Sequence, residues 1–286
     1  MKKIFAAILF LTVLVSAAGF AACGGSGAGG NETAIIDNLI LVQESYGIAG
    51  RKEDKAFISE INDALIAIRE TGYKTVAAKY GFEKELAVTE NTVNPLAGST
   101  DDSWEKIKAS GKIIIGYTVF APIAYTDQSG EFTGFDIDLA KETIKYLNEK
   151  YSLGLQAEFQ LITWSAKETN LEEGTIDLIW NGLTITADRQ SNMCISVPYL
   201  YNNQVAVIRK ADEAIYTSDT ATFAGAILGA EKGSAGEEVI TANGLGKEKL
   251  TFNSQLEAYN QLKAGTVDVI VIDSVMANYY IGAENK

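Results

Sequence analysis

Apolar segments of strand length alternate with helical segments between Lys112 and Ser274. The strand-like segments are residues 112–119, 157–164, 175–182, 202–210, 225–232, 249–253 and 268–274. The helical segments, with apolar residues at helical spacing, are 135–151, 234–244 and 254–265. Strands that alternate with helices build mainly parallel sheets, because each helix returns the chain to the start of the next strand. The chain is therefore predicted to have an α/β fold.

The part of the chain before Lys112 contains a helix pair and a polar linker. Apolar residues such as Ile58, Ile61 and Leu65 recur at helical spacing within residues 55–81, and "ETGYKT" interrupts the pattern. Residues 91–103, "NTVNPLAGSTDDS", are polar and contain proline and glycine. We predict that they join two structured parts of the chain.

The first residues have the features of a secretory leader. Lys2 and Lys3 precede an apolar run that is too short to favour a membrane span. Small residues before Cys23 and a glycine-rich segment after it resemble a lipoprotein processing site, so we predict a signal peptide at 1–22 and a lipidated cysteine with a flexible linker at 23–33. An ordinary signal peptide with a chance cysteine is the alternative. The mature protein is expected outside the cytoplasm, anchored by lipid to the cell membrane.

The composition excludes several classes of function. The chain has no histidine and, besides Cys23, only Cys194, so it lacks zinc-type ligand sets, Ser/His pairs and Cys/His pairs. No intrachain disulfide, metal or cofactor is predicted. The formal net charge of −13 at pH 7 would repel nucleic acid. Carboxylate chemistry remains open, and the length suits two compact lobes.

Two charged residues follow strand-like segments, where the loops of α/β proteins converge on a ligand. Arg189 lies just beyond Thr184, and its guanidinium could bind a carboxylate in bidentate fashion. The alternative is a surface arginine in the first turn of a helix capped by Thr186. Asp273 ends another apolar segment, and it either caps the next helix or meets a cation.

A third candidate is "EKGSAGEE", in which Ser234 and Glu237 form a capping box at the start of a helix. Free N–H groups at such a start bind anions. The same pattern recurs with Ser254 and Glu257, so the cap alone does not identify a site.

Aromatic residues also lie near the ends of strand-like segments, where they either pack in the core or stack on a ligand. They are Phe120, Tyr125, Trp164 and Trp180. A guanidinium and helix N–H groups for a carboxylate, a carboxylate for an ammonium, and aromatic walls together match the groups of a free α-amino acid.

Five longer motifs carry a family resemblance. They are "GEFTGFDIDLAKE", "ITWSAKETNLEEGTIDLIWNGLTITADR", "GSAGEE", "DVIVIDS" and "YGIAGRKEDKAF". In these motifs the chain resembles the family 3 extracellular solute-binding proteins, the amino-acid receptors of ABC importers. The resemblance implies a two-lobed, periplasmic-binding-protein-like (type II) fold. A monomer of this kind closes on an amino acid and presents it to the membrane permease, without catalysis.

The resemblance also implies which residues bind the ligand's carboxylate. Arg189, Thr184 and the Gly182 backbone would hold it from the first lobe. Ser234 and the Ala235 N–H would hold it from the second lobe.

The remaining contacts implied by the resemblance concern the ammonium and the side chain of the ligand. Asp273 would bind the α-ammonium. Phe120 and Trp164 would flank the side chain, and Asn181 would face the specificity pocket.

The segment "GYTVFAP" lacks the acidic residues that several relatives have between the first strand and the aromatic wall. A basic side chain would lack a counter-charge there, and desolvating it unpaired is expensive, so we predict an uncharged polar amino acid. Glu44 could replace the missing acid, and Tyr125 is a second candidate for specificity. An alternative function on this fold is a dehydratase that uses a carboxylate in the cleft, with Glu44 as an acid of raised pKa.

The order of the motifs differs from that of the family. In the family, "YGIAGRKEDKAF" and its helix pair close the chain, whereas here they come first. We therefore predict a circular permutant whose former ends are joined by the linker at 91–103. The first lobe would be continuous at 46–208, and the second would consist of 34–45 plus 209–286.

Overall fold

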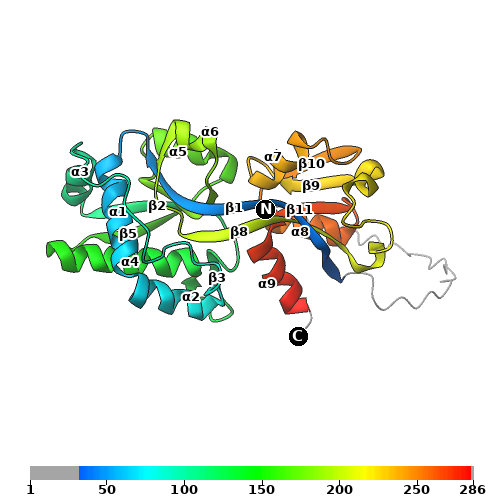
Figure 1. Cartoon of the computed structure of the whole chain (residues 1–286), viewed down its shortest axis with the longest axis horizontal. Helices are drawn as coiled ribbons and strands as arrows, with labels where there is room; N and C mark the ends of the chain where they lie inside the picture. Colours follow the sequence, from blue (N-terminus) through cyan, green and yellow to red (C-terminus); the bar gives the residue numbers. More distant parts are fainter. Residues whose placement is uncertain (1–31, 285–286) are drawn as a thin grey trace, which may run out of the picture.

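The computed structural model describes residues 32–284, which form two lobes joined by two long strands (Figure 1). The strands are β1 (Thr33–Arg51) and β8 (Leu200–Arg209), which pair antiparallel and run from one lobe to the other. The predicted leader and Cys23 lie outside the described residues. The two-lobed architecture predicted from the sequence is confirmed.

The first lobe consists of the elements between β1 and β8. Its helices are α1 (Lys55–Ala67), the π-helical η1 (Arg69–Tyr73), α2 (Lys74–Tyr80), α3 (Ser103–Ser110), α4 (Phe135–Tyr151), the 3-10 helix η2 (Trp164–Ala166), α5 (Lys167–Glu172) and α6 (Ala187–Asn192). Its strands are β2 (Lys112–Tyr117), β3 (Tyr125–Thr126), β4 (Phe132–Thr133), β5 (Gln156–Leu161), β6 (Leu178–Thr184) and β7 (Met193–Ile195).

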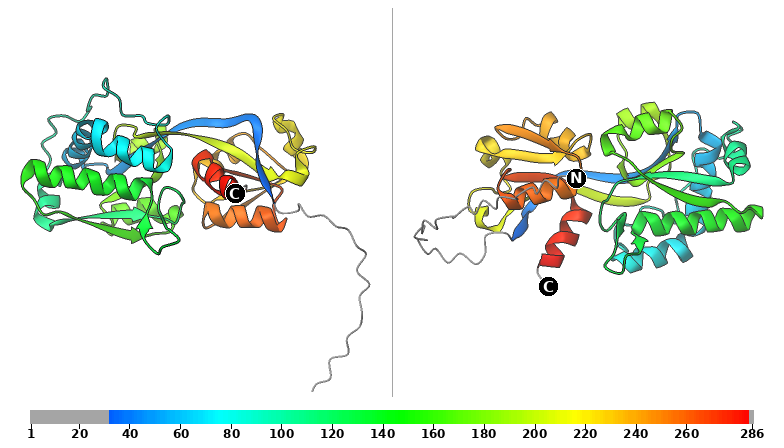
Figure 2. Two further views of the ribbon diagram at one scale, coloured as in Figure 1. Left: turned by 90° about the horizontal axis from the view of Figure 1, so that it is seen from below. Right: turned by 180° about the vertical axis from the view of Figure 1, so that it is seen from behind.

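The second lobe follows β8 and also takes in the first part of β1. Its elements are η3 (Lys210–Asp212), η4 (Thr220–Gly225), β9 (Ile227–Glu231), α7 (Ala235–Ala242), β10 (Glu248–Phe252), α8 (Gln255–Ala264), β11 (Val269–Asp273) and α9 (Ser274–Glu284). Figure 2 shows from two further sides that β1 and β8 are the strands that cross between the lobes.

One nine-stranded sheet runs through both lobes, in the order β10-β9-β11-β8-β1-β6-β2-β5, with β7 paired to β1 beside this path. The strands β5, β2 and β6 are parallel in the first lobe, as are β10, β9 and β11 in the second. The crossing strands β1 and β8 are antiparallel to their neighbours. Every residue of β6 is buried, which is typical of a strand with both faces covered.

The second lobe has one apolar core on each face of its sheet. Ala206 and Ile208 of β8 pack with one cluster, whereas Val205 and Val207 pack with the other. This alternation follows from the two-residue period of a strand, which sends successive side chains to opposite faces. The first lobe has a larger core beneath α1 and α4, and β6 contributes Leu178 and Trp180 to it.

The helix pair is more continuous than the sequence predicts. Residues 70–73 of the segment "ETGYKT" lie in the π-helical η1 and its last two residues begin α2, so the chain passes from α1 to α2 without a loop. A Cβ atom at Gly72 would lie only 3.2 Å from Cβ of Glu142 on α4. Glycine therefore lets the widened turn approach α4 closely, where a local break was expected.

The predicted linker at 91–103 contains no helix or strand before α3. It packs against the start of α1: the Ala56 N–H donates to Oδ2 of Asp101 at 2.8 Å, and the Phe57 N–H donates to Oγ of Ser103 at 2.9 Å. Nδ2 of Asn94 donates to the Ser59 carbonyl at 3.0 Å. The linker thus satisfies N–H groups that a helix start leaves without partners.

The boundary between the lobes differs from the predicted one. Residues 204–208, expected in the first lobe, pair with β11 and therefore belong to the second lobe. The physical reason is that β8 is one uninterrupted strand whose first residues pair beside the first lobe and whose last residues pair within the second. No helix within residues 32–284 is both long and apolar enough to cross a membrane.

Candidate ligand-binding site

A small cavity of about 10 Å³ lies between the lobes, where several strands end. It is lined by Thr118, Phe120, Trp164, Asn181, Gly182, Thr184 and Arg189 from the first lobe, and by Glu231, Ala235, Gln255 and Asp273 from the second. All the predicted ligand-binding residues except Ser234 are in this lining. Two oppositely charged groups from different lobes, Arg189 and Asp273, therefore face one site.

The Arg189 guanidinium spans the two lobes. Arg189 lies in α6. The first turn of this helix is capped by Thr186, whose Oγ1 accepts a hydrogen bond from the Arg189 N–H at 3.2 Å. Nη1 donates to the Thr184 carbonyl at 2.9 Å, and Nη2 donates to the Gly233 carbonyl of the second lobe at 3.2 Å. Nη2 also lies 3.5 Å from a carboxylate oxygen of Glu238. Both sequence interpretations of Arg189 hold in part, because its backbone is capped and its side chain is buried in the cleft.

Asp273 is the last residue of β11 and is held by neutral donors from both lobes. Its Oδ1 accepts hydrogen bonds from the Tyr46 hydroxyl and from Nδ2 of Asn202, the latter at 2.7 Å. Its Oδ2 accepts one from Nε2 of Gln255. None of these three donors is a cation. The buried carboxylate is therefore hydrogen-bonded without a cation among these donors, so a ligand ammonium could pair with it.

Glu44, on β1, shares the donor Asn202 with Asp273. One carboxylate oxygen of Glu44 accepts from Asn202 at 2.5 Å and from Gln204 at 2.9 Å, and the other accepts from Oγ1 of Thr184 at 3.0 Å. Burial, and then the charge of Asp273, raise the pKa of Glu44 to about 8. Glu44 does not line the small cavity.

Glu231 is a cavity residue that the sequence reasoning missed. It ends β9 and its side chain is buried, and among the described residues one of its carboxylate oxygens has no hydrogen-bond partner. Burial, followed by the charge of Asp273, raises the pKa of Glu231 to about 8, and Lys167 acts in the opposite direction. The available signal was an acidic residue at the end of the apolar segment "GAILGAE", directly before the capping-box loop.

The loop after β9 has the predicted capping box. Oγ of Ser234 accepts from the Glu237 N–H at 3.2 Å, and a Glu237 carboxylate oxygen accepts from the Gly233 N–H at 2.7 Å. The equivalent box at Ser254 and Glu257 is also present. Ala235 lines the cavity, whereas the Ser234 hydroxyl lies one residue behind it as the cap.

Lys167 is a second residue near the site that sequence reasoning missed. Its Nζ donates to the Gly233 carbonyl at 3.3 Å, and it lies 4.9 Å from the centre of the Trp164 ring. The Gly233 carbonyl thus accepts hydrogen bonds from two first-lobe cations, Lys167 and Arg189. These contacts hold the lobes together in the described structure.

Gly182 has a different role from the one implied by the resemblance. Its N–H already donates to Oδ2 of Asp136 at 2.8 Å, so it is not a free donor for a carboxylate. Its φ is 64°, and a Cβ atom added here would lie only 2.8 Å from Cε1 of Phe120, so both the backbone and the space require glycine. The residue therefore shapes the wall of the cavity beside Phe120.

Asn181 retains an unused acceptor. Its Nδ2 donates to Oγ1 of Thr118 at 2.8 Å, while its Oδ1 has no partner in the described part of the chain. The amide is thus oriented by Thr118 in the lining of the small cavity, and the expectation that Asn181 faces a specificity pocket stays a prediction.

Two of the aromatic residues singled out in the sequence lie outside the cavity. Tyr125 begins the β3–β4 hairpin, and its ring packs 5.7 Å from that of Tyr279 on α9. Tyr125 therefore does not line the small cavity, because the hairpin carries its ring to the last helix of the second lobe. Trp180 is a core residue packed near Tyr199, as its alternative interpretation allowed.

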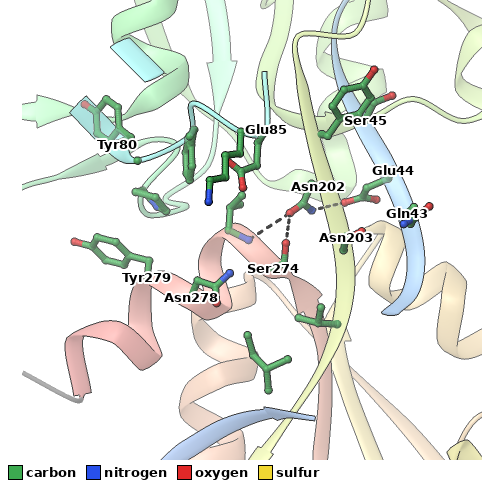
Figure 3. Close-up of a pocket in the computed structure, with 18 of the residues that line it drawn as sticks. Gln43, Glu44, Ser45, Tyr80, Glu85, Asn202, Asn203, Ser274, Asn278 and Tyr279 are labelled. Atoms are coloured by element: carbon green, nitrogen blue, oxygen red, sulfur yellow. Dashed lines mark hydrogen bonds between the residues drawn. The ribbon is translucent and has the colours of Figure 1, made fainter. Parts of the chain in front are cut away.

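A larger cavity of about 950 Å³ lies between the end of α2 and α9, beside the crossing strands (Figure 3). Here Asn202 of β8 links the lobes: its Nδ2 donates to Glu44, and its Oδ1 accepts from the Ser274 hydroxyl at 2.8 Å and the Val275 N–H at 3.3 Å. Neither Arg189 nor Asp273 is among the residues that line this larger cavity. We regard it as the gap around the strands that join the lobes.

The fold and the site define the class of protein. Two α/β lobes joined by two strands enclose a buried site with opposite charges on opposite lobes, which is the arrangement of a two-lobed ligand-binding protein of type II. A family model described as bacterial extracellular solute-binding proteins, family 3, matches residues 113–265. The chain belongs to this family.

Individual relatives agree with this assignment. Over 174 residues the chain is 26% identical to the L-cystine-binding protein TcyJ of Escherichia coli strain K12. The match covers 60% of this chain and 62% of that protein, so the chain spans less than two thirds of the length of this relative. A substrate-binding protein of an ABC uptake transporter from Streptococcus pneumoniae, solved with bound histidine, is 36% identical with a TM-score of 0.58, covering 65% of this chain and 76% of that one.

A third relative bears on the enzymatic alternative. It is the ancestral amino acid-binding protein AncCDT-1, a precursor of cyclohexadienyl dehydratase. Its structure is 27% identical with a TM-score of 0.56, and the match covers 63% of this chain and 78% of that one.

Proposed function

We propose that the protein binds a free α-amino acid between its lobes and delivers it to the permease of an ABC importer. The observation that carries the proposal is the pair of buried, oppositely charged groups, Arg189 from the first lobe and Asp273 from the second, at one cavity. An α-amino acid has one carboxylate and one ammonium, so it can neutralise both at once. The family membership supports the same conclusion.

The proposed binding step exchanges contacts on Arg189. In the described structure its Nη atoms donate to the Thr184 and Gly233 carbonyls, which are neutral acceptors. A ligand carboxylate is a stronger, bidentate acceptor for a guanidinium. Its ammonium would bind Asp273 on the other lobe, so ligand binding would stabilise the closed arrangement and shift the population toward it.

The direct test is thermal unfolding of the mature protein with each of the twenty amino acids. A ligand that binds only the folded form raises the apparent stability by mass action, by about 2.7 kcal/mol at a concentration 100 times its dissociation constant. We expect at least one amino acid to stabilise the protein, and the corresponding amine without a carboxylate, or acid without an amine, to have little effect. No stabilisation by any amino acid would contradict the proposal.

We further propose that the protein acts as a monomer attached to the outer face of the cell membrane through lipid at Cys23. Both halves of the cavity come from one chain, so binding needs no second copy. The lipid is supported by the sequence around Cys23. Cys23→Ala should move the protein from the membrane fraction to the soluble fraction, and its retention in the membrane fraction would contradict the anchor.

The expectation of an uncharged polar ligand loses its basis in the structure. It rested on the absence of an acid in "GYTVFAP", but Glu231 lines the cavity and Glu44 lies just behind Asp273. The cleft therefore has acidic groups from other elements, and the argument against a basic side chain no longer holds.

Binding without catalysis is the better-supported function. The dehydratase alternative requires Glu44 to reach the substrate, and burial does raise its pKa to about 8. However, both oxygens of Glu44 accept hydrogen bonds from protein donors, and Glu44 is not among the residues that line the small cavity with Arg189 and Asp273. The protein should return a bound ligand chemically unchanged, and a dehydration product after prolonged incubation with a cyclic dienyl acid would favour the enzyme.

A further inference from the structure

Glu231 has an unused hydrogen-bonding capacity in the ligand cavity. Its side chain is 5% exposed, it ends β9, and it lines the cavity together with Gln255 and Asp273. Among the described residues its Oε1 has no partner. Since a buried carboxylate oxygen without a donor is costly, this atom requires either a proton or a donor from the ligand.

The charged neighbours of Glu231 are occupied elsewhere. Lys167 of α5 donates to the Gly233 carbonyl, packs on the Trp164 ring and lies 3.7 Å from Glu168. Arg189 of α6 binds the Thr184 and Gly233 carbonyls.

The remaining neighbours of Glu231 are acidic or neutral. The charge of Asp273 on β11 helps to raise the pKa of Glu231 and that of Glu44 on β1. Gln255 of α8 donates to Asp273, and its side-chain hydrogen bond to Glu231 acts to lower the pKa of Glu231. No neighbouring cation in the described part of the chain is therefore directed at the free oxygen of Glu231.

Glu231 is the acidic cavity residue that remains available to the side chain of the ligand. If Arg189 takes the carboxylate and Asp273 takes the ammonium, as proposed above, both main-chain charges are matched. Glu231 is then an additional acid in a cavity whose other side-chain contacts are Phe120, Trp164 and the free oxygen of Asn181. Two acceptor oxygens between aromatic walls suit a side chain that donates hydrogen bonds.

We propose that Glu231 is a specificity-determining residue that selects a basic amino acid by accepting hydrogen bonds from its cationic side chain. This inference rests on the proposed function. A cationic side chain satisfies the free oxygen and neutralises the buried charge. A neutral side chain leaves Glu231 either ionised and unpaired or protonated.

Proton release accompanies binding of a basic ligand in this scheme. Because burial and Asp273 raise the pKa of Glu231 to about 8, the carboxyl of the free protein is mostly protonated at neutral pH. A basic ligand displaces this proton, so its affinity should increase as the pH rises toward about 8 and then level off. An uncharged ligand displaces none, so its affinity should change little over this range.

The test is isothermal titration calorimetry with arginine, lysine, histidine, glutamine and serine on the wild-type protein and two variants. Glu231→Gln preserves the shape of the side chain and removes its charge. Glu248→Gln is the control, because Glu248 is an exposed residue at the start of the adjacent strand β10. Thermal unfolding of each variant without ligand verifies that it is folded.

We expect the wild type and Glu248→Gln to prefer a basic amino acid to glutamine by about tenfold or more, the range of a charge-assisted hydrogen bond. Glu231→Gln should lose this preference and keep its affinity for neutral ligands. Repeating the wild-type titration in buffers of different ionisation enthalpy should reveal the release of close to one proton per basic ligand at pH 7, a measurement that stands even if Glu231→Gln fails to fold.

Three results would overturn the inference. They are tighter binding of a neutral amino acid by the wild type, an unchanged basic preference in Glu231→Gln, and no proton release with a basic ligand. In each case the protein still binds an amino acid, so the proposed function survives. If no amino acid binds the wild-type protein, the proposed function fails and the inference with it.

Discussion

At the scale of single residues, the clamp on the ligand carboxylate depends on Arg189. We predict that Arg189→Ala abolishes or strongly weakens amino-acid binding, because the lost charge-assisted contact is worth roughly 1.5–3 kcal/mol or more when buried. The fold should survive, since the Thr186 cap of α6 uses only the backbone of Arg189. Titration calorimetry measures the loss, with Arg69→Ala, in the π-helical η1, as the control. Binding that is undiminished in Arg189→Ala would remove Arg189 from the site.

A second prediction at this scale concerns Glu44 and pH. Its pKa is about 8 in the folded protein against an ordinary value of 4.5, so the folded state holds a proton that the unfolded state loses. The contribution of Glu44 to the free energy of unfolding is fully present below about pH 4.5 and is lost as the pH rises to about 8. Over this range the free energy of unfolding falls by up to about 1.4 kcal/mol per pH unit.

The variant Glu44→Gln isolates this contribution. Its free energy of unfolding in urea, relative to wild type, should increase from pH 5 to pH 8, because the amide has no proton to lose. Asp136 and Glu231, whose pKa values burial also raises, are the same in both proteins and cancel in the difference. Parallel pH profiles would contradict the raised pKa of Glu44.

The site residues could be predicted from sequence wherever a motif fixed them relative to a strand end. Arg189, Thr184 and Asp273 follow buried strands, and the structure brings them to one cavity. Glu231 and Lys167 were missed because their importance depends on the distance between lobes, which no local pattern contains. The position of Tyr125 away from the small cavity could not be predicted for the same reason, since the direction of a short hairpin decides which lobe its ring contacts.

At the scale of elements, two helices begin with the same capping motif but differ in their distance from the ligand cavity. Ser234 begins α7 beside the cavity and Ser254 begins α8, and each hydroxyl accepts from the N–H of a glutamate three residues later. We predict that Ser234→Ala and Ser254→Ala each lower the free energy of unfolding by about 1 kcal/mol. Only Ser234→Ala should also weaken amino-acid binding, which calorimetry would show. Equal effects of both variants on affinity would mean that Ser234 acts only as a cap.

The elements themselves followed closely from periodicity. The helix α4 has the predicted bounds, Phe135–Tyr151, because its apolar face and acidic first turn are both local signals. Residues 34–45 were assigned to the second lobe from the order of the motifs alone, whereas the strand β1 extends over nineteen residues, from Thr33 to Arg51. Its polar residues, such as Gln43 and Glu44, pair with β8 across the gap between the lobes, and this pairing is a tertiary contact that strand periodicity does not reveal.

At the scale of the whole molecule, we propose that the chain is a circular permutant of its family's usual order. Residues 33–35 pair with β8 inside the second lobe, and Ile35 packs in the same apolar cluster as Tyr280 and Ile281 of α9. Both ends of the described chain thus belong to one lobe. The segment 91–103, which would replace the usual ends, runs from the helix pair to α3 within the first lobe.

The proposal predicts that the usual order can be restored without loss of function. In the rearranged chain a short Gly/Ser linker joins Glu284 to Thr33, and new ends are opened between residues 95 and 99. All pairing in the sheet and both sides of the cavity are retained, and each doubling of a loop's length costs only about 0.6 kcal/mol, so the variant should fold and bind the same amino acid with similar affinity. Circular dichroism, thermal unfolding and calorimetry would measure this, with a chain cut at the same point but not rejoined as the control. The rejoined variant keeps every native contact outside the two altered loops. If it fails to fold, the present order of the chain is required for the structure, and the proposal is contradicted.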